Sequence, residues 1–171
     1  MKYKLGKGGD PNFIIRPYSF SPLYLAAQRG LIETARILIQ ANADVNFKDE
    51  QGRTPLYAAV NKQALLNMLL DENPDVTTVD KSGVNFLQMY FQYTIQAESK
   101  TPNVFNLFSL PMSLQADNSQ AYKKTYSDIV KRLISAGARM PANSRDTQYI
   151  LKHLHESSWE EMESLAKSAI N

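Results

Sequence analysis

The chain has 171 residues, enough for one domain with a hydrophobic core. Its 19 Lys and Arg and 17 Asp and Glu leave a net charge of +2, too small to indicate a nucleic-acid or anionic-lipid partner. The chain has no cysteine, which excludes disulfides and thiolate metal sites and fits a cytoplasmic protein. No apolar run approaches the roughly 20 residues that span a bilayer, so we expect no membrane span.

Residues 21–46 predict two short helices, each followed by a turn. Ser21 is expected to cap the first helix, with Pro22 at its first position and Gly30 at its end. A second amphipathic run follows, and Asn42 is expected to end it, because Asn tolerates the left-handed conformation. The apolar residues expected to face the core are Leu23, Ala26, Ala27, Ile32, Ala35, Leu38 and Ile39.

The same pattern returns 33 residues later, where Thr54 and Pro55 repeat Ser21 and Pro22. The segment NADVN, which starts at Asn42, is echoed by NPDVT from residue 73. A period near this value is typical of arrays of helix pairs. The two repeats resemble the ankyrin repeat family, whose pattern is D-x-x-G-x-T-P-L-H-x-A-A-x-x-G, a second helix and G-A-D-V-N. The resemblance implies an all-α, ankyrin-type α-solenoid of about three to four repeats with short β-hairpin-like turns.

We expect one ankyrin domain over residues 1–171. Residues 16–20 lack the Asp and Gly of the pattern, which argues against a regular hairpin there. The second repeat is two residues short between its helices, and its second helix is expected over 65–70. The expected segments are a partial repeat at 1–12, repeats at 13–46, 47–79 and 80–140, and helices at 141–171 that cap the open end of the core.

The third repeat departs from the pattern. Asn85 is expected to cap its first helix as Thr54 caps the helix before. Tyr90 and Phe91 stand where the pattern has small alanines. A 31-residue insertion near 95–125 separates the two helices, which we expect to extend into it from 86–96 and from near Asn118.

The C-terminal residues predict a degenerate terminal repeat. Helical spacing is present over 147–155 and again from Ser158. His153 and His155 are two apart on a helix, so they face different sides and cannot share a metal ion. Phosphate-binding, nucleophile-elbow and zinc-protease motifs are all missing, so we expect no catalytic, cofactor or metal site and no enzymatic activity. Aspartates recur near residues 44, 49, 75 and 80, and we attribute them to turn preference alone.

The resemblance implies a protein partner bound at hairpin tips and at exposed first-helix positions. Together these positions predict a ribbon with aromatic residues at its ends and cations in its middle. Tyr and Arg are favoured at interface hot spots; the alternative is an ordinary solvated face. The expected partner-binding residues are Tyr18, Phe20, Gln28, Arg29, Glu50, Gln51, Arg53, Asn61, Lys62, Lys81, Ser82, Gln92 and Tyr93.

The insertion is a second candidate for partner binding or self-association. It is too apolar to be simply solvated, and it either folds back over the third repeat or docks a partner. Its candidate residues are Phe105, Leu107, Phe108 and Leu110.

The sequence therefore predicts a protein–protein interaction module that presents a rigid concave surface. Eccentric repeats of this kind also resemble those of bacterial effectors and viral host-interaction proteins, so a scaffold and a host-directed effector in the host-cell cytosol are both considered. The alternatives are an enzyme or toxin-like protein, with a site in the insertion or the C-terminal helices, and a regulatory arm of a larger chain.

Overall fold

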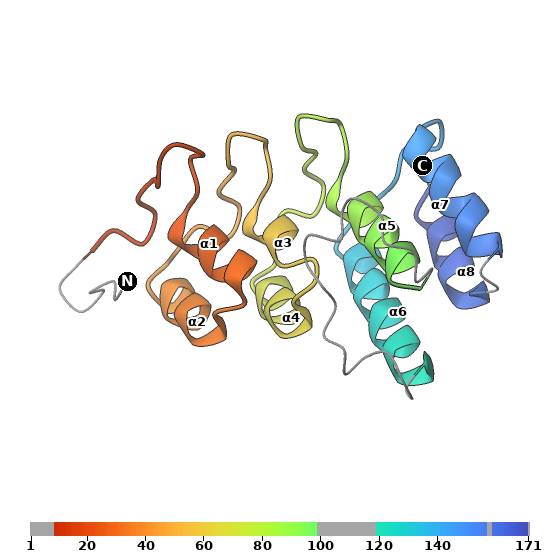
Figure 1. Ribbon diagram of the computed structural model, residues 1–171, viewed down its shortest axis with the longest axis horizontal. Helices are drawn as coiled ribbons and strands as arrows, with labels where there is room; N and C mark the ends of the chain where they lie inside the picture. Colours follow the sequence, from red (N-terminus) through yellow and green to blue (C-terminus); the bar gives the residue numbers. More distant parts are fainter. Residues whose placement is uncertain (1–8, 99–118, 157–158, 171) are drawn as a thin grey trace. The chain divides into compact units, whose positions relative to one another are not determined.

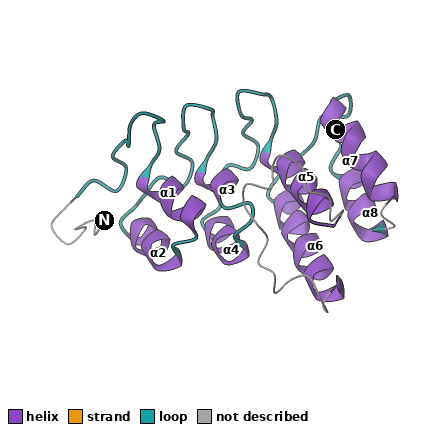
Figure 2. Cartoon of the chain, viewed as in Figure 1, coloured by secondary structure: helices purple, strands orange, loops and turns teal. Residues whose placement is uncertain are grey.

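The computed structural model describes residues 9–98, 119–156 and 159–170 (Figure 1). These ranges contain helices joined by loops and no strands (Figure 2), which confirms the expected all-α class. The helices are α1 (Pro22–Arg29), α2 (Ile32–Gln40), α3 (Pro55–Ala58), α4 (Gln63–Asp71), α5 (Phe86–Glu98), α6 (Ser119–Ser135), α7 (Arg145–Glu156) and α8 (Glu160–Ser168).

The contacts within the chain define two compact units. Unit 1 comprises Met1–Asp75 and Val79–Lys81, and unit 2 comprises Val76–Thr78 and Ser82–Asn171. The described part of unit 1 holds α1 to α4, and that of unit 2 holds α5 to α8. The division falls where the second expected repeat meets the third.

The first helix pair begins and ends at the expected residues. The Tyr24 backbone N–H donates to Ser21 Oγ at 3.1 Å, and Gly30 adopts a left-handed φ of 74° after α1. Asn42 and Asn73 take the same conformation after α2 and α4, with φ of 62° and 51°. Of the expected core residues, Leu23, Ala26, Ala27, Ala35 and Leu38 are buried.

Two local expectations in unit 1 are wrong. Ile32 is 38% exposed, because it is the first residue of α2 and lies at the turn, where fewer neighbouring atoms cover it. Thr54 makes no side-chain capping bond. Helix α3 has only four residues, and the N–H groups of Tyr57 and Ala58 donate to the Thr54 carbonyl oxygen at 3.0 and 3.4 Å instead.

The first hairpin forms although its residues do not match the pattern. Ile15 and Phe20 exchange backbone hydrogen bonds at 2.8 and 3.1 Å, so the argument against a hairpin here was wrong. The reason is that Ser19 reaches a φ of 55°, close to the 78° of Gly52 in the next hairpin. A non-glycine residue can occupy this region at a modest cost.

Unit 2 has a core of large aromatic residues. Tyr90 and Phe91 on α5 are completely buried. The ring of Tyr126 on α6 lies 5.8 Å from that of Tyr90 and 6.3 Å from that of Trp159, centroid to centroid. Both helices extend into the expected insertion, as predicted; its remainder, 99–118, lies outside the described residues.

The cap of α5 and the terminal helices complete unit 2. Asn85 caps α5 as expected: its Oδ1 accepts from Gln88 N–H at 2.9 Å, and Gln88 Oε1 accepts from Asn85 N–H at 3.1 Å. Helix α7 covers the expected run 147–155, and α8 begins at Glu160, whereas Ser158 is not among the described residues. In the described ranges, no helix combines the length and apolarity needed to cross a membrane.

Candidate protein-binding surface

The second hairpin is held together by one buried carboxylate. Asp49 Oδ1 accepts from the backbone N–H groups of Gln51 and Arg53 at 2.8 and 2.9 Å. Its Oδ2 lies 3.0 Å from Arg53 Nε and 2.9 Å from Arg53 Nη2. Turn preference accounts for only part of this aspartate's role, because it also fixes the guanidinium group of Arg53.

The hairpin tips of unit 1 are joined to one another. The Glu50 N–H donates to the Tyr18 carbonyl oxygen at 3.5 Å, and Ser19 Oγ donates to Glu50 Oε1 at 3.1 Å. The Lys81 N–H donates to the Gln51 carbonyl oxygen at 2.8 Å. The three tips therefore form a single hydrogen-bonded edge, which reduces the entropy that each would lose on binding.

Three aromatic rings are stacked from the first hairpin into the core. Tyr18 is 62% exposed, and its ring centroid lies 5.5 Å from that of Phe20. Phe20 in turn stacks on buried Tyr24 at 4.7 Å, with the rings nearly parallel at 4°. Burial raises the pKa of Tyr24 to about 12, Arg53 opposes this, and Asp49 adds to it through charge and a hydrogen bond. Tyr24 thus stays a neutral donor to Asp49, and the exposed Tyr18 ring rests on a fixed support.

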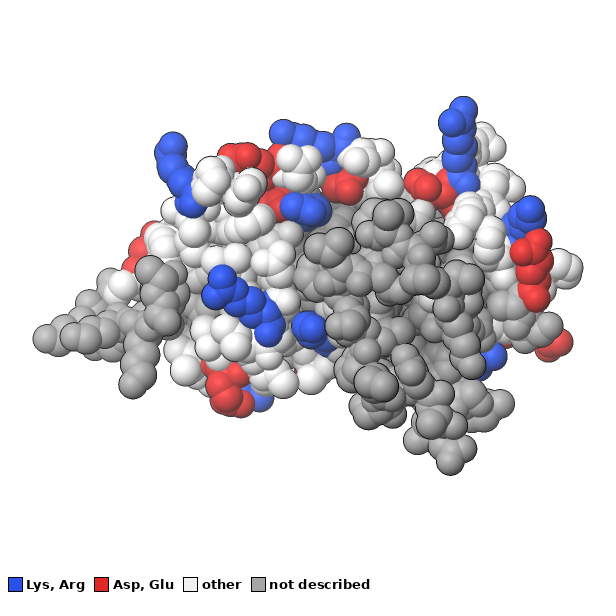
Figure 3. All heavy atoms as spheres, in the orientation of Figure 1, with Lys and Arg blue, Asp and Glu red and all other residues white. Residues whose placement is uncertain are grey.

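Arg29 is the last residue of α1, and the stem of Lys62 lies beside Gly30, which follows it. Arg29 is exposed, and the Cδ and Cε of Lys62 lie 3.4 Å from the position that a Cβ on Gly30 would occupy. Neither side chain forms an ion pair with another described residue. A helix C-terminus favours cations. Arg29 is exposed there and Lys62 is half-buried, so Arg29 is the more accessible of the two. Figure 3 shows Lys and Arg side chains standing on uncharged surface over α1 and α3.

Unit 1 brings together ten of the thirteen expected partner-binding residues. Arg53 differs from the other cations because Asp49 already holds it. The ten are Tyr18, Phe20, Gln28, Arg29, Glu50, Gln51, Arg53, Asn61, Lys62 and Lys81.

The other three residues belong to unit 2. Ser82 is exposed and Gln92 is half-buried. Tyr93 is half-buried in the aromatic core, with its ring 6.2 Å from that of Tyr126, and burial together with Tyr126 raises its pKa. Phe105, Leu107, Phe108 and Leu110 of the insertion lie outside the described residues.

Sequence reasoning missed two cations on the same side of unit 1. Arg16 and Lys48 are exposed beside the first and second hairpins, and neither pairs with a described carboxylate. They do not occupy family contact positions, so the resemblance could not select them. Counting the charged residues on each side of the first two repeats would have identified both cations.

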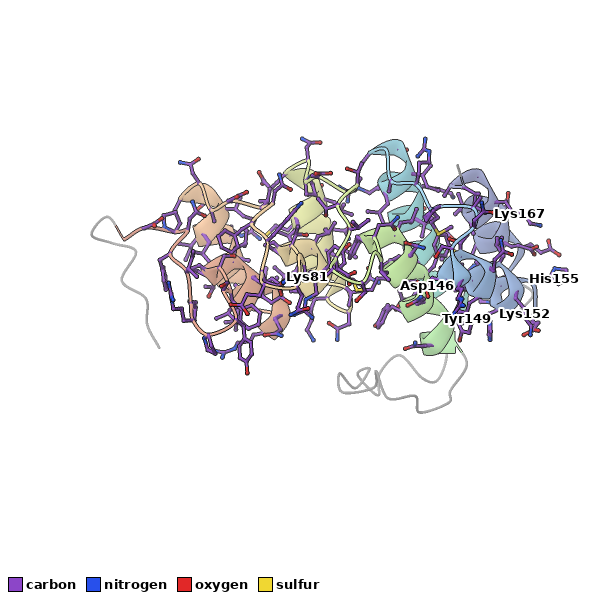
Figure 4. All side chains as sticks on the ribbon, turned by 90° about the horizontal axis from the view of Figure 1, so that it is seen from above. Lys81, Asp146, Tyr149, Lys152, His155 and Lys167 are labelled. Atoms are coloured by element: carbon purple, nitrogen blue, oxygen red, sulfur yellow. The ribbon has the colours of Figure 1, made fainter. Side chains whose placement is uncertain are left out.

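The C-terminal helices show no metal centre. Within residues 9–98, 119–156 and 159–170, no group of three or more His, Asp or Glu side chains is placed to hold a metal ion. His153 Nδ1 lies 2.9 Å from the Tyr149 carbonyl oxygen, and His155 Nδ1 lies 3.4 Å from Glu163 Oε1. Figure 4 shows Tyr149, Lys152 and His155 projecting from the surface of α7.

Pairs of short antiparallel helices, connected through hydrogen-bonded hairpin tips and repeated at a fixed period, define the class of repeat proteins called α-solenoids. A family model described as ankyrin repeats in three copies matches residues 1–80. An ankyrin repeat domain from Acinetobacter baumannii has the same fold, with a TM-score of 0.67 and 20% identity, over 97% of this chain and 72% of that one. Residues 1–80 are therefore similar to ankyrin repeats, and the chain has the fold of an ankyrin repeat domain, as its sequence predicted.

Several proteins are similar to this chain in sequence, most of them over part of its length. Protein phosphatase 1 regulatory subunit 12A of mouse is 44% identical over 63 residues, 36% of this chain and 6% of that protein. Human Rabankyrin-5 is 42% identical over 57 residues, 33% of this chain and 5% of that protein. A putative ankyrin repeat protein of fowlpox virus is 26% identical over 163 residues, 86% of this chain and 35% of that one. This chain thus spans only a minor share of these relatives' length.

Proposed function

We propose that the chain binds a protein partner through the hairpin tips and first-helix ends of unit 1. Ankyrin repeats are protein–protein interaction modules, and the finer question is which surface of this one is used. The observation that carries the proposal is the exposed Tyr18 ring, supported by Phe20 and Tyr24 on a hydrogen-bonded edge. A large aromatic on a fixed support contributes contact area without losing much conformational freedom.

The proposal is tested by selecting binders from a displayed peptide and domain library with the full chain. Tyr18→Ala and the double variant Arg29→Glu, Lys62→Glu are then compared with the wild type. Both should lose about tenfold or more in affinity, because removing a hot-spot anchor costs about 2 kcal/mol or more. Arg53 is left unchanged, because its replacement would also break the hairpin that Asp49 organises.

Arg36→Glu is the matched control. Arg36 lies on α2, where its Nε is 3.6 Å from Glu33 Oε2, and both side chains are largely exposed. The substitution reverses the same charge on another face of unit 1 and should leave binding unchanged. Equal binding by the wild type and both test variants would reject this surface as the binding site.

We also propose that the chain acts as a scaffold or as a host-directed effector. The likeness to a fowlpox virus ankyrin repeat protein supports a host-directed role. Expression in host cells of a reporter-tagged chain, followed by fractionation, tests whether it resides in the cytosol with its partner. The enzyme alternative places a site in the insertion or in the C-terminal helices, and a turnover that disappears when residues 99–118 are deleted would support the first of these.

A further inference from the structure

We propose that the segment docked on unit 1 is acidic and carries an aromatic or large apolar residue about four positions from its carboxylates. This inference rests on the protein-binding function proposed above and adds the chemistry of the partner. Three observations lead to it: the separation of charge across unit 1, the excess of cations over carboxylates on its cationic side, and the distance between Tyr18 and the cations.

Charge in unit 1 is separated between two sides. The segments 1–75 and 79–81 hold ten Lys or Arg and nine Asp or Glu, so the net charge is close to zero. At or after the ends of α2 and α4, carboxylates gather: Asp44, Asp71, Glu72 and Asp75. At the hairpins and the ends of α1 and α3, five cations have no ion pair with a described residue: Arg16, Arg29, Lys48, Lys62 and Lys81.

Three carboxylates lie on the cationic side of unit 1. Asp49 is buried and bound to Arg53, and Glu50 accepts from Ser19. Asp80 acts on Tyr57, whose pKa it raises together with the larger effect of burial. The six cations of this side, Arg53 included, outnumber its three carboxylates, and Arg29 and Lys62 form no ion pair with a described residue. A carboxylate that complements Arg29 and Lys62 has to come from another molecule.

The spacing within the partner follows from the length of α1. The Tyr18 platform lies beside the start of α1 and Arg29 is its last residue. Eight helical residues at 1.5 Å each separate the two by about 12 Å. An extended chain covers this distance in about four residues at roughly 3.3 Å each. An aromatic or apolar residue against Tyr18 therefore places carboxylates four positions away beside Arg29 and Lys62.

A nucleic acid is the competing polyanion. Its backbone requires several cations in excess, because binding strength scales with the number of phosphates neutralised. In unit 1 the positive charges outnumber the negative ones by only one, although they lie on different sides. This distribution fits a short acidic peptide better than a long polyanion. A single-stranded oligonucleotide is therefore included as a competitor in the test.

The experiment measures fluorescence anisotropy of a labelled synthetic peptide on the full chain at low and high salt. The acidic probe carries one Trp and a run of Glu centred four residues away, and its twin has Gln in place of each Glu. We expect saturable binding of the acidic probe, at least about tenfold tighter than that of the Gln twin and weakened by salt. Arg29→Gln and Lys62→Gln should each weaken it about two- to fivefold, as expected for exposed ion pairs. The control, Arg36→Gln, should leave it unchanged.

The outcomes separate this inference from the function on which it rests. Equal binding of both peptides, or insensitivity to Arg29→Gln and Lys62→Gln, overturns the acidic partner. If library-selected binders are nevertheless lost with Tyr18→Ala, the binding function of this surface still stands. If the oligonucleotide displaces the probe and binds more tightly at equal salt, the site is one for nucleic acid and the proposal is wrong.

Discussion

The helix pairs of the two units pack through side chains of different size, small in unit 1 and large in unit 2. In unit 1 the helices α1 and α2 have eight and nine residues, and Ala26 and Ala27 are buried between them and their neighbours. In unit 2 the corresponding helices α5 and α6 have 13 and 17 residues. There Tyr90 and Phe91 occupy the alanine positions and are completely buried.

The difference shows how core size and helix length depend on each other. Alanine lets helix backbones approach closely, so a short helix buries enough of its surface against its neighbours. Tyr and Phe hold helices further apart, and additional turns and rings are needed to fill the space at close-packed density. Unit 2 supplies them with Tyr126 and Trp159, while unit 1 keeps its aromatic stack at the hairpin, beside its candidate binding surface.

Tyr90→Ala should strongly destabilise the aromatic core of unit 2. Truncating a fully buried aromatic leaves a cavity and costs about 3–5 kcal/mol in the free energy of unfolding. Trp159 is the chain's one tryptophan and belongs to this core, so its fluorescence in urea reports the effect directly. Tyr149→Ala, at a site 41% exposed in the same unit, is the control and should cost less than about 1 kcal/mol. Equal losses for the two would contradict the aromatic core described here.

Asp49→Ala tests the polar counterpart in unit 1. The substitution removes the acceptor for two backbone N–H groups, the Arg53 guanidinium and the Tyr24 hydroxyl. We expect a loss of about 3 kcal/mol, because two backbone N–H groups lose their acceptor and the partly exposed Arg53 loses its partner. Circular dichroism should record the loss, with a smaller change in Trp159 fluorescence, which reports on unit 2.

Asp44→Ala is the matched control for the buried aspartate. Asp44 is exposed, and its carboxylate accepts from the Asn46 N–H at 2.8 Å. Its loss should cost about 1 kcal/mol or less. If Asp44→Ala and Asp49→Ala destabilise the chain equally, the hairpin aspartate acts only as a turn former, as the sequence alone suggested.

The caps offer a third comparison between the units. Asn85→Ala removes a reciprocal cap with Gln88 and a 2.7 Å bond from Nδ2 to the Arg139 carbonyl oxygen, so we expect a loss of about 1–2 kcal/mol. Thr54→Val keeps the shape of a residue that makes no capping bond, and should change stability by less than about 0.5 kcal/mol. Thermal unfolding of both variants measures the difference, and a larger loss for Thr54→Val would show that its hydroxyl has a role the structure does not reveal.

Local signals predicted most of the fold, and the exceptions have physical causes. Ser21, Gly30, Asn42 and Asn85 act locally, and each does what its residue type favours. The first hairpin was missed because Ser19 adopts a left-handed φ that sequence assigns to glycine. Its conformation is supported by a hydrogen bond from its Oγ to Glu50, 31 residues away, which no local rule includes.

The candidate surface was predicted residue by residue, but its internal organisation could not be. The family pattern selects positions such as Arg29, Arg53 and Lys62, without indicating which of them are already paired. Only the geometry shows that Arg53 forms an ion pair with Asp49, whereas Arg29 and Lys62 form no ion pair with a described residue. The stacking of Phe20 on Tyr24 likewise depends on a tertiary contact between a hairpin and a helix.

The smallest expected effect concerns an exposed ion pair of unit 2. Lys131 Nζ on α6 lies 2.7 Å from Glu161 Oε1 on α8, and this hydrogen bond lowers the pKa of Glu161 below 4.5, with Ser127 contributing less. A carboxylate whose folded-state pKa is lowered stabilises the fold above its unfolded pKa, and the stabilisation is lost as pH falls through the lower folded-state value. Glu161→Gln should therefore lower the urea midpoint slightly at pH 7. The difference from wild type should begin to fade near pH 4, around the ordinary Glu pKa, and vanish only below the lower folded-state pKa.

Glu160→Gln separates this ion pair from the general effect of charge. Glu160 lies in the same first turn of α8, so its replacement removes the same interaction with the helix dipole but no contact to Lys131. Subtracting its midpoint shift from that of Glu161→Gln at each pH leaves the contribution of the bridge between α6 and α8. Both side chains of the bridge are about half exposed, so this remainder should also shrink as salt is raised. A remainder that persists at high salt and low pH would mean that Glu161 stabilises unit 2 by packing and not by its charge.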